Sequence, residues 1–251
     1  MAIEVFNRYE KKYIISDDIY QKLKQDFSNY MELDQYSQNG EFYTICNIYY
    51  DTDDNDIIRR SLEKPIYKEK LRLRSYGAAG LRDRIYLEVK KKFKGCVNKR
   101  RISIVHEDAL RYLETKQIPE TIGLVNRQIL SEIDFMVQRY PSLHPALFLS
   151  YERNAMFGSE NKNFRITFDT NILTRRYDLG LGYGIYGELL IPRDQWIMEV
   201  KIDQTAPLWF AKLLSKYKVF PVSCSKYGLE FENSILKKST AIEIDYKKIC
   251  I

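Results

Sequence analysis

The sequence has few of the residues on which several kinds of site and structure depend. It contains only two histidines, His106 and His144, so catalysis by a Ser-His or Cys-His pair is not expected. Its four cysteines form no C-x-x-C pair, which predicts free thiols and neither a zinc site nor a disulfide framework. No run of 18 apolar residues is present, so no membrane span is expected. The first residues carry charges where a signal peptide needs an apolar stretch, and we therefore expect a cytoplasmic protein.

Charged and aromatic side chains are abundant instead. Of the 251 residues, 45% are hydrophobic and 29% are charged, which predicts a globular fold with a substantial core. The 20 tyrosines and 12 phenylalanines favour β-structure. Lys and Arg number 40 against 34 Asp and Glu, and the net charge of +6 suits an anionic ligand without requiring one. We find no internal repeat and no linker, so a single domain is expected over residues 1–251.

The hydrophobic pattern predicts an α+β domain with about eight strands. Strands are expected at Arg8–Ile15, Phe42–Tyr50, Tyr67–Tyr76, Arg84–Phe93, Lys99–Val105, Ala146–Met156, Phe164–Leu173 and Gln195–Ile202. Helices are expected from the N-cap Ser16 to about Asn29, and at His106–Thr115, Pro119–Tyr140, Pro207–Lys216 and Lys226–Lys238. So many strands in one domain predict a barrel or a large antiparallel sheet.

Several of these strands carry positive charge along one face. Residues i and i+2 share a face of a strand, so Tyr67–Tyr76 places four cations on one side. The faces that this alternation predicts are Lys68, Lys70, Arg72 and Arg74; Arg84, Tyr86, Glu88, Lys90 and Lys92; Arg8, Glu10 and Lys12; Arg165, Thr167 and Asp169; and Ile197, Glu199 and Lys201.

These charged faces have two interpretations. They could form the solvated side of a sheet. However, neighbouring charges of one sign repel each other unless an anion lies between them. We therefore expect the apolar faces to pack outward against helices and the cations to point into a barrel that binds phosphate groups. The carboxylates Glu10, Glu88 and Glu199 would then hold Mg²⁺ or Mn²⁺, which prefer oxygen ligands and bridge phosphates.

The sequence contains an ordered set of short motifs. They are R-Y-E-K-K-Y at Arg8–Tyr13, N-I-Y-Y-D-T at Asn47–Thr52, K-L-R-L-R-S-Y-G at Lys70–Gly77, Y-L-E-V-K-K-K at Tyr86–Lys92, R-I-S-I at Arg101–Ile104, Y-E-R-N-A at Tyr151–Ala155, R-I-T-F-D-T at Arg165–Thr170, M-E-V-K at Met198–Lys201 and S-K-Y at Ser225–Tyr227. In this order the motifs resemble the VTC domain, which is the polyphosphate polymerase domain of the vacuolar transporter chaperone complex. That domain belongs to the triphosphate tunnel metalloenzyme, or CYTH-like, superfamily.

The resemblance implies a closed eight-stranded antiparallel barrel, the triphosphate tunnel, with helices packed outside. It implies phosphate-gripping roles for Lys12, Arg72, Arg74, Lys90, Arg153, Arg165, Lys201 and Lys226, and a metal role for Glu199. Among these we expect Arg72, Arg74, Lys90 and Lys201 to be catalytic. Lys70 joins the phosphate-binding set from its cationic row, and Ser225 from the S-K-Y motif. The expected roles of Arg153 and Lys226 rest on the resemblance alone, because the hydrophobic pattern of the sequence would place both residues on the surface.

The expected activity is metal-dependent transfer of a phosphoryl group from a nucleoside triphosphate such as ATP to a polyphosphate chain. Such transfer needs positioning and charge neutralisation more than a protein nucleophile. A triphosphatase of the same fold is one alternative, and a non-catalytic polyphosphate or nucleotide sensor is another. Arg8 stands where the superfamily signature Glu-x-Glu-x-Lys has its first Glu, which favours the polymerase-like branch. Nucleic acid is not an expected partner, because it would need its cations on an open surface.

Overall fold

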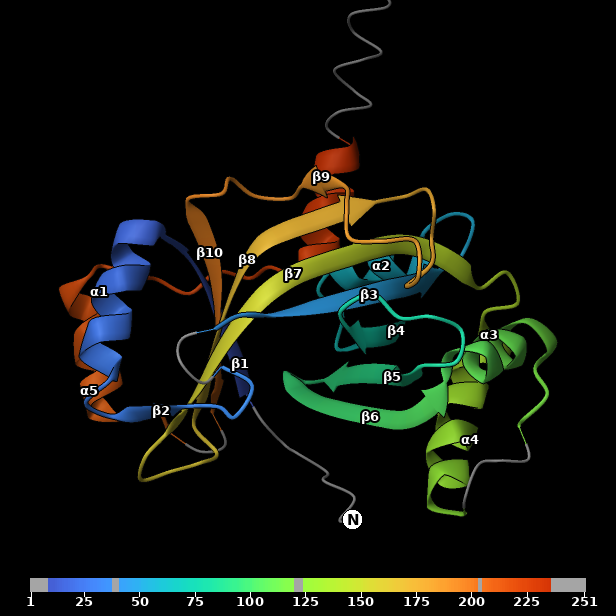
Figure 1. Cartoon of the computed structure of the whole chain (residues 1–251), viewed down its shortest axis with the longest axis horizontal. Coiled ribbons are helices and arrows are strands. Elements are labelled where there is room, and N and C mark those ends of the chain that lie inside the picture. The colour runs from blue at the N-terminus through green and yellow to red at the C-terminus, as the bar shows by residue number, and fades with distance from the viewer. Residues whose placement is uncertain (1–8, 38–40, 120–123, 203–204, 236–251) are drawn as a thin grey trace, which may run out of the picture.

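The computed structural model describes residues 9–37, 41–119, 124–202 and 205–235. Figure 1 shows a large sheet with helices at two of its sides. The strands are β1 (Tyr9–Ser16), β2 (Met31–Leu33), β3 (Tyr43–Asp51), β4 (Tyr67–Tyr76), β5 (Arg84–Phe93), β6 (Cys96–Val105), β7 (His144–Gly158), β8 (Arg165–Arg175), β9 (Glu188–Leu189) and β10 (Gln195–Ile202). The helices are α1 (Asp17–Phe27), α2 (Asp56–Leu62), α3 (His106–Thr115), α4 (Leu124–Arg139) and α5 (Leu208–Lys216), and residues 226–235 are also helical.

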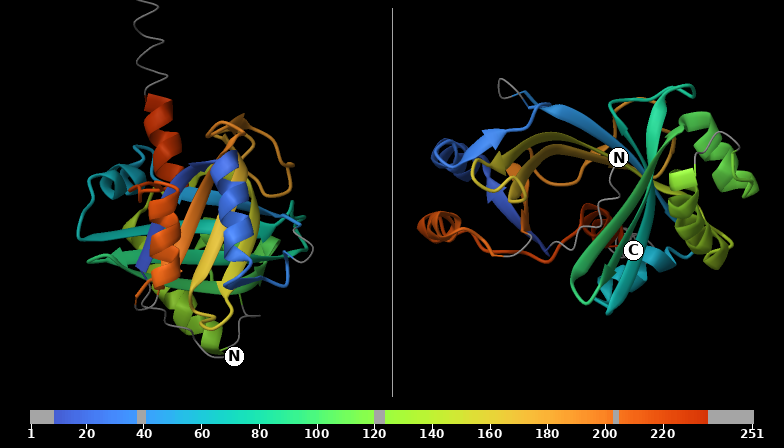
Figure 2. Two further views of the ribbon diagram at one scale, coloured as in Figure 1. Left: turned by 90° about the vertical axis from the view of Figure 1, so that its left-hand side faces the viewer. Right: turned by 90° about the horizontal axis from the view of Figure 1, so that it is seen from below.

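The ten strands form one antiparallel sheet with the order β1-β10-β8-β7-β3-β4-β5-β6. The short strands β2 and β9 pair with β7 and β8 at the side of this path. The sheet is strongly curled, and its edge strands β1 and β6 approach until Cα atoms lie within 8 Å of each other (Figure 2). Within the described ranges no backbone ladder joins β1 to β6. The closed barrel implied by the resemblance is therefore corrected to a curled sheet that stays open.

A segment near the C-terminus explains the opening. The backbone N–H of Val222 donates to the carbonyl oxygen of Lys12 at 2.7 Å and forms an isolated bridge with β1. This contact occupies the edge of β1 on which β6 would have to pair. A side-chain pair, Lys90 Nζ to Glu10 Oε2 at 2.6 Å, connects β5 to β1 across the gap.

The apolar faces of the strands do point outward, as the alternation predicts. Leu71, Leu87 and Ile102 pack from β4, β5 and β6 against α3 and α4. At the other end of the sheet, Phe168 and Met198 pack against α1 and α5. These two helical layers lie on opposite sides of the molecule in Figure 1. Because the outer faces are buried under helices, the charged faces are left on the concave side of the sheet.

Local signals set several of the element boundaries. Ser16 Oγ accepts the N–H of Ile19 at 3.4 Å, and this cap begins α1 as predicted. Helix α2 is not predicted by the pattern, because it is short and its cap comes from outside the helix. Its first N–H groups, those of Ile57 and Ile58, donate to the buried carboxylate of Asp51 at 2.9 and 3.1 Å. Strand β6 begins at Cys96, three residues before the predicted start. Separately, none of the described helices is long and apolar enough to cross a membrane.

Candidate functional site

A cavity of about 650 Å³ lies on the concave side of the curled sheet. Strands β1, β4, β5, β6, β7 and β10 and residues 221–232 contribute to its walls. The predicted site residues that line it are Glu10, Lys12, Lys70, Arg72, Arg74, Lys90, Arg153, Glu199, Lys201, Ser225 and Lys226. The structure thus gathers cations from strands that are far apart in sequence, and the interpretation of these faces as solvent-exposed is wrong.

Glu88 lies behind one wall of the cavity and holds its cations in place. Its side chain is 1% exposed, and Oε2 accepts from Arg72 Nε at 2.8 Å and Nη2 at 2.7 Å. Lys99 Nζ lies 2.8 Å from Oε1, and Arg74 Nε lies 3.7 Å from Oε2. Burial acts to raise the pKa of Glu88, but the charges of Arg74, Arg72 and Lys99 outweigh it and hold the pKa well below its usual range. Three cations therefore surround this carboxylate, which anchors the wall and does not line the cavity as Glu10 and Glu199 do.

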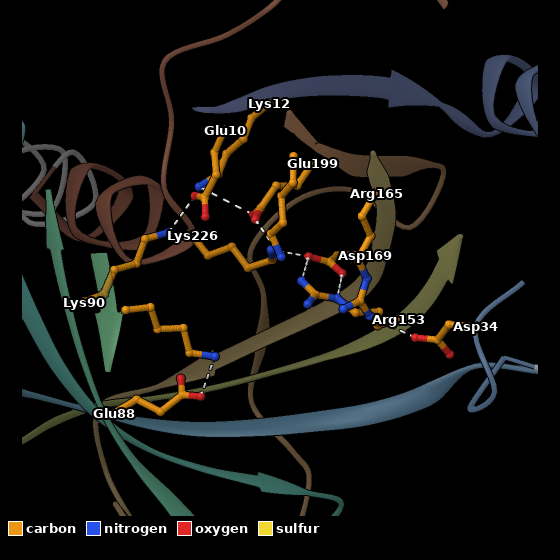
Figure 3. A network of polar contacts seen from close by, with 12 residues as sticks. Glu10, Lys12, Asp34, Glu88, Lys90, Arg153, Arg165, Asp169, Glu199 and Lys226 are labelled. Carbon is orange, nitrogen blue, oxygen red and sulfur yellow. Dashed lines mark hydrogen bonds and ion pairs between the residues drawn. The ribbon is translucent and has the colours of Figure 1, made fainter. Parts of the chain in front are cut away.

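Asp169 plays the same part on the opposite wall (Figure 3). Arg153 donates to it twice, from Nε to Oδ1 at 2.6 Å and from Nη2 to Oδ2 at 2.8 Å, and Lys226 binds Oδ2 as well. Burial acts to raise the pKa of Asp169, but Arg153 and Lys226 keep it below its usual value. Sequence reasoning placed Asp169 on the polar face of its strand but assigned it no role. The available signal was its position within the motif R-I-T-F-D-T.

Glu199 is one of the carboxylates that line the cavity. It lies on β10 opposite Lys12 of β1, and its oxygens are 4.0 Å from Lys12 Nζ and 3.6 Å from Lys201 Nζ. Burial acts to raise its pKa, whereas Lys201, Lys12, Lys90 and Arg153 hold it well below the usual range. Both cations are farther from Glu199 than a normal hydrogen bond, so neither of them donates one to this carboxylate.

Lys70 is crowded by other cations. Its Nζ donates to Ser225 Oγ at 3.1 Å, and within the described residues no ion pair to a carboxylate is found for it. Burial is the main reason that its pKa is lowered to about 7, and the charges of Lys12, Lys90, Lys68 and Arg72 lower it further. Such a group is costly without an anion beside it, so this part of the cavity is suited to bind one.

One predicted phosphate-binding residue points away from the cavity. Arg165 does not line the cavity, because its Nη2 donates to Asp34 Oδ2 at 2.9 Å and its side chain turns towards the end of β2. Its position on the polar face of β8 is as predicted, but Asp34, brought close by the pairing of β2 with β7, draws it aside. Arg8 lies outside the described residues.

The acidic residues at the cavity could bind a metal ion only together with ligands from a bound substrate. Among the described residues no group of three His, Cys, Asp or Glu side chains could hold an ion by itself. Glu10 and Glu199 lie on one face of neighbouring strands, two residue positions apart along the ladder, as the pairs Glu10–Lys201 and Lys12–Glu199 show. Mg²⁺ commonly binds through one or two carboxylates together with substrate phosphates. These residues therefore fit an ion that is held partly by a bound triphosphate.

Comparison with known proteins agrees with this geometry. The VTC domain family matches residues 7–234 of the chain. No protein of curated function matches. A candidate adenylate cyclase from Bacillus halodurans has a TM-score of 0.54 and 16% identity, and the match covers 88% of this chain and 94% of that one. A candidate adenylyl cyclase from Hippeastrum, described as having a dominant triphosphatase activity, has a TM-score of 0.50 and 15% identity over 90% of this chain and 96% of its own.

At such identities the two structures show a shared fold and nothing finer. The family match is different in kind, because it extends over most of the chain and includes every strand that lines the cavity. The order of the motifs, the curled antiparallel sheet and the family match together lead to one conclusion: this chain belongs to the VTC domain family.

Proposed function

We propose that the protein is a metal-dependent phosphotransferase that moves the terminal phosphoryl group of ATP or another nucleoside triphosphate to the end of a polyphosphate chain. The cavity is the site of this reaction, and one VTC domain over residues 1–251 carries it. Among the described residues Cys46 and Cys224 are free thiols, which is consistent with the reducing cytoplasm as its proposed location.

The observation that carries the proposal is the excess of cations in one enclosed space. Glu88 and Asp169 each neutralise part of a wall, but Lys70 and Lys201 lie in the cavity with lowered pKa values, to about 7 and about 8. Burial is the first cause in both cases. A chain of phosphates would supply the negative charge that these buried cations need.

The proposed reaction needs no covalent intermediate with the protein. A terminal oxygen of the polyphosphate attacks the γ-phosphorus, the bond from that phosphorus to the β,γ-bridging oxygen breaks, and the nucleoside diphosphate leaves with that oxygen. Arg72 and Arg153 offer planar N–H donors to the transferred group, and Lys90 and Lys201 offer ammonium charge. Glu88 and Asp169 keep both arginines oriented before the substrate binds. Lys12, Lys70, Arg74, Ser225 and Lys226 would hold the flanking phosphates.

A divalent ion, Mn²⁺ or Mg²⁺, would supply charge neutralisation at the phosphate oxygens when it is bound. Glu199, with Glu10 beside it, is the group that would hold this ion. Arg165 lies near the site but is not assigned a phosphate contact, because its hydrogen bond to Asp34 holds it outside the cavity.

The test is incubation of the purified protein with ATP and Mn²⁺, with and without short polyphosphate primers, followed by gel analysis of product length. Chain growth supports the polymerase. Release of orthophosphate or pyrophosphate without chain growth supports the triphosphatase, the second candidate, which the activity described for the Hippeastrum protein favours. Tight binding of tripolyphosphate without turnover would indicate a sensor.

A further inference from the structure

Four tyrosines form an exposed aromatic cluster beside the cavity. The tyrosine cluster consists of Tyr36, Tyr43, Tyr76 and Tyr86, whose ring centroids are 6.0 to 6.4 Å apart in four pairwise contacts. Tyr36 is 65% exposed and Tyr76 is 52% exposed. A single exposed tyrosine is ordinary, but exposed aromatic rings that contact each other in a cluster point to a ligand.

Strand register places the cluster at the next position beyond the cationic wall. Tyr76 follows Arg74 by two residues on β4, so both side chains are on the concave face, about 7 Å apart along the strand. Tyr86 is the partner of Arg74 on β5, and Tyr43 is the partner of Arg153 on β7. A ligand that contacts the cluster with one end can therefore reach the cationic cavity past Arg74 with the other.

The geometry of the cluster suits a planar ring. The rings of Tyr36 and Tyr76 are nearly parallel, with 19° between their planes and 6.4 Å between their centroids. Because both rings are more than half exposed, a flat ring can stack against either of them. The Arg101 guanidinium lies 4.7 Å from the centre of Tyr86, and it adds a second planar group that can stack. Arg and aromatic side chains together are typical of surfaces that bind nucleobases.

We infer that the tyrosine cluster binds the nucleobase of the triphosphate donor, so that the donor's phosphates extend past Arg74 and Arg153 into the cavity. This inference rests on the proposed function, which it deepens by naming the class of donor and its direction. At the other end of the cationic row, Lys68 lies close to Lys64 and Lys92. The polyphosphate acceptor would bind at this lysine-rich end. Stacking accepts every base, so several nucleoside triphosphates serve as donors and purines bind more tightly than pyrimidines.

Calorimetric titration of ATP and of inorganic tripolyphosphate, each with Mn²⁺, separates the base from the phosphates. Tyr76→Ala is expected to weaken ATP binding on the order of 10-fold, because it removes one stacking surface, and to leave tripolyphosphate binding unchanged. Tyr36→Ala is expected to act in the same way. Tyr76→Phe keeps the ring and should bind ATP like the wild type. Tyr183→Ala, at a tyrosine that is 66% exposed between β8 and β9, is the matched control and should change neither affinity.

The two titrations distinguish failure of the nucleobase site from failure of the proposed function. If tripolyphosphate binds to all variants and ATP binding is also unchanged in Tyr76→Ala and Tyr36→Ala, the inference is wrong and the proposed function stands. Equal losses for ATP and tripolyphosphate overturn the inference too, because they show a general disturbance of the cavity. If the wild type binds neither compound, the proposed function fails, and the inference fails with it.

Discussion

The carboxylate of Asp169 on β8 accepts two hydrogen bonds from the Arg153 guanidinium on β7, at 2.6 and 2.8 Å. The same carboxylate binds Lys226 from the helix over residues 226–235. One buried anion thus fixes two cavity-lining cations that arise from distant parts of the chain. Glu88 does the same for Arg72 and Lys99 on the other wall. The cavity is arranged as two walls of cations, each anchored from behind.

Removing the anchor at Asp169 should destabilise the empty protein. We expect Asp169→Asn to lower the free energy of unfolding by roughly 3 kcal/mol, because it leaves Arg153 and Lys226 buried without their counter-charge. Urea denaturation measures this. Asp18→Asn, which breaks an exposed i,i+4 pair with Lys22, should cost no more than about 1 kcal/mol. Similar losses in both variants would show that Asp169 is not a special anchor.

Removing the guanidinium group of Arg72 should weaken the binding of phosphates. Arg72→Ala is expected to reduce tripolyphosphate affinity by at least about 10-fold, since a hydrogen bond to a charged group contributes ~1.5–3 kcal/mol. Calorimetric titration measures it, with Arg111→Ala on the exposed face of α3 as the control. Wild-type affinity in Arg72→Ala would exclude a phosphate-binding role for this residue.

The role of Glu199 is tested by separating binding from turnover. Glu199→Gln removes the charge without changing the shape of the side chain, and we expect Mn²⁺-dependent product formation to fall by roughly 100-fold or more. Metal-free binding of tripolyphosphate should be retained or become tighter, because a negative charge leaves a cavity that binds an anion. Glu32→Gln, whose exposed carboxylate pairs with Lys162, is the control. Full Mn²⁺-dependent activity in Glu199→Gln would assign the metal to other residues.

Lys70 should make phosphate binding depend on pH. Its pKa is lowered to about 7 in the empty protein, from an ordinary value of 10.5, by burial first and by neighbouring cations second. Between these values the unfolded chain holds more protons than the folded one, so this lysine makes the empty protein more stable as pH rises through that window. A bound phosphate chain favours the ammonium form, so at pH 8 binding takes up protons and affinity falls as pH rises.

Proton uptake can be measured by titrating tripolyphosphate calorimetrically at pH 8 in two buffers that differ in ionisation enthalpy. Lys70→Arg keeps the charge but does not titrate in this range, so it should reduce the uptake. The same number of protons taken up by wild type and variant would rule out Lys70 as the titrating group.

The sequence alone determined which side of each strand would carry charge. A strand has a period of two, so placing Leu71 and Leu73 against helices fixes Arg72 and Arg74 on the opposite side, whatever the order of strands. For the same reason the cations could be assigned to a common interior before any topology was known. The family resemblance added Arg153 and Lys226, which the pattern by itself would have placed on the surface.

The tertiary structure decided everything that depends on which strands meet. Asp169 and Lys226 are 57 residues apart, and only the curl of the sheet brings them together. Asp34 diverts Arg165 because β2 pairs with β7, and Val222 keeps the barrel open because it pairs with Lys12. Short elements such as β2 and the segment at Val222 carry too little periodicity to be predicted. Their positions follow from long-range packing and charge pairing, which no local pattern encodes.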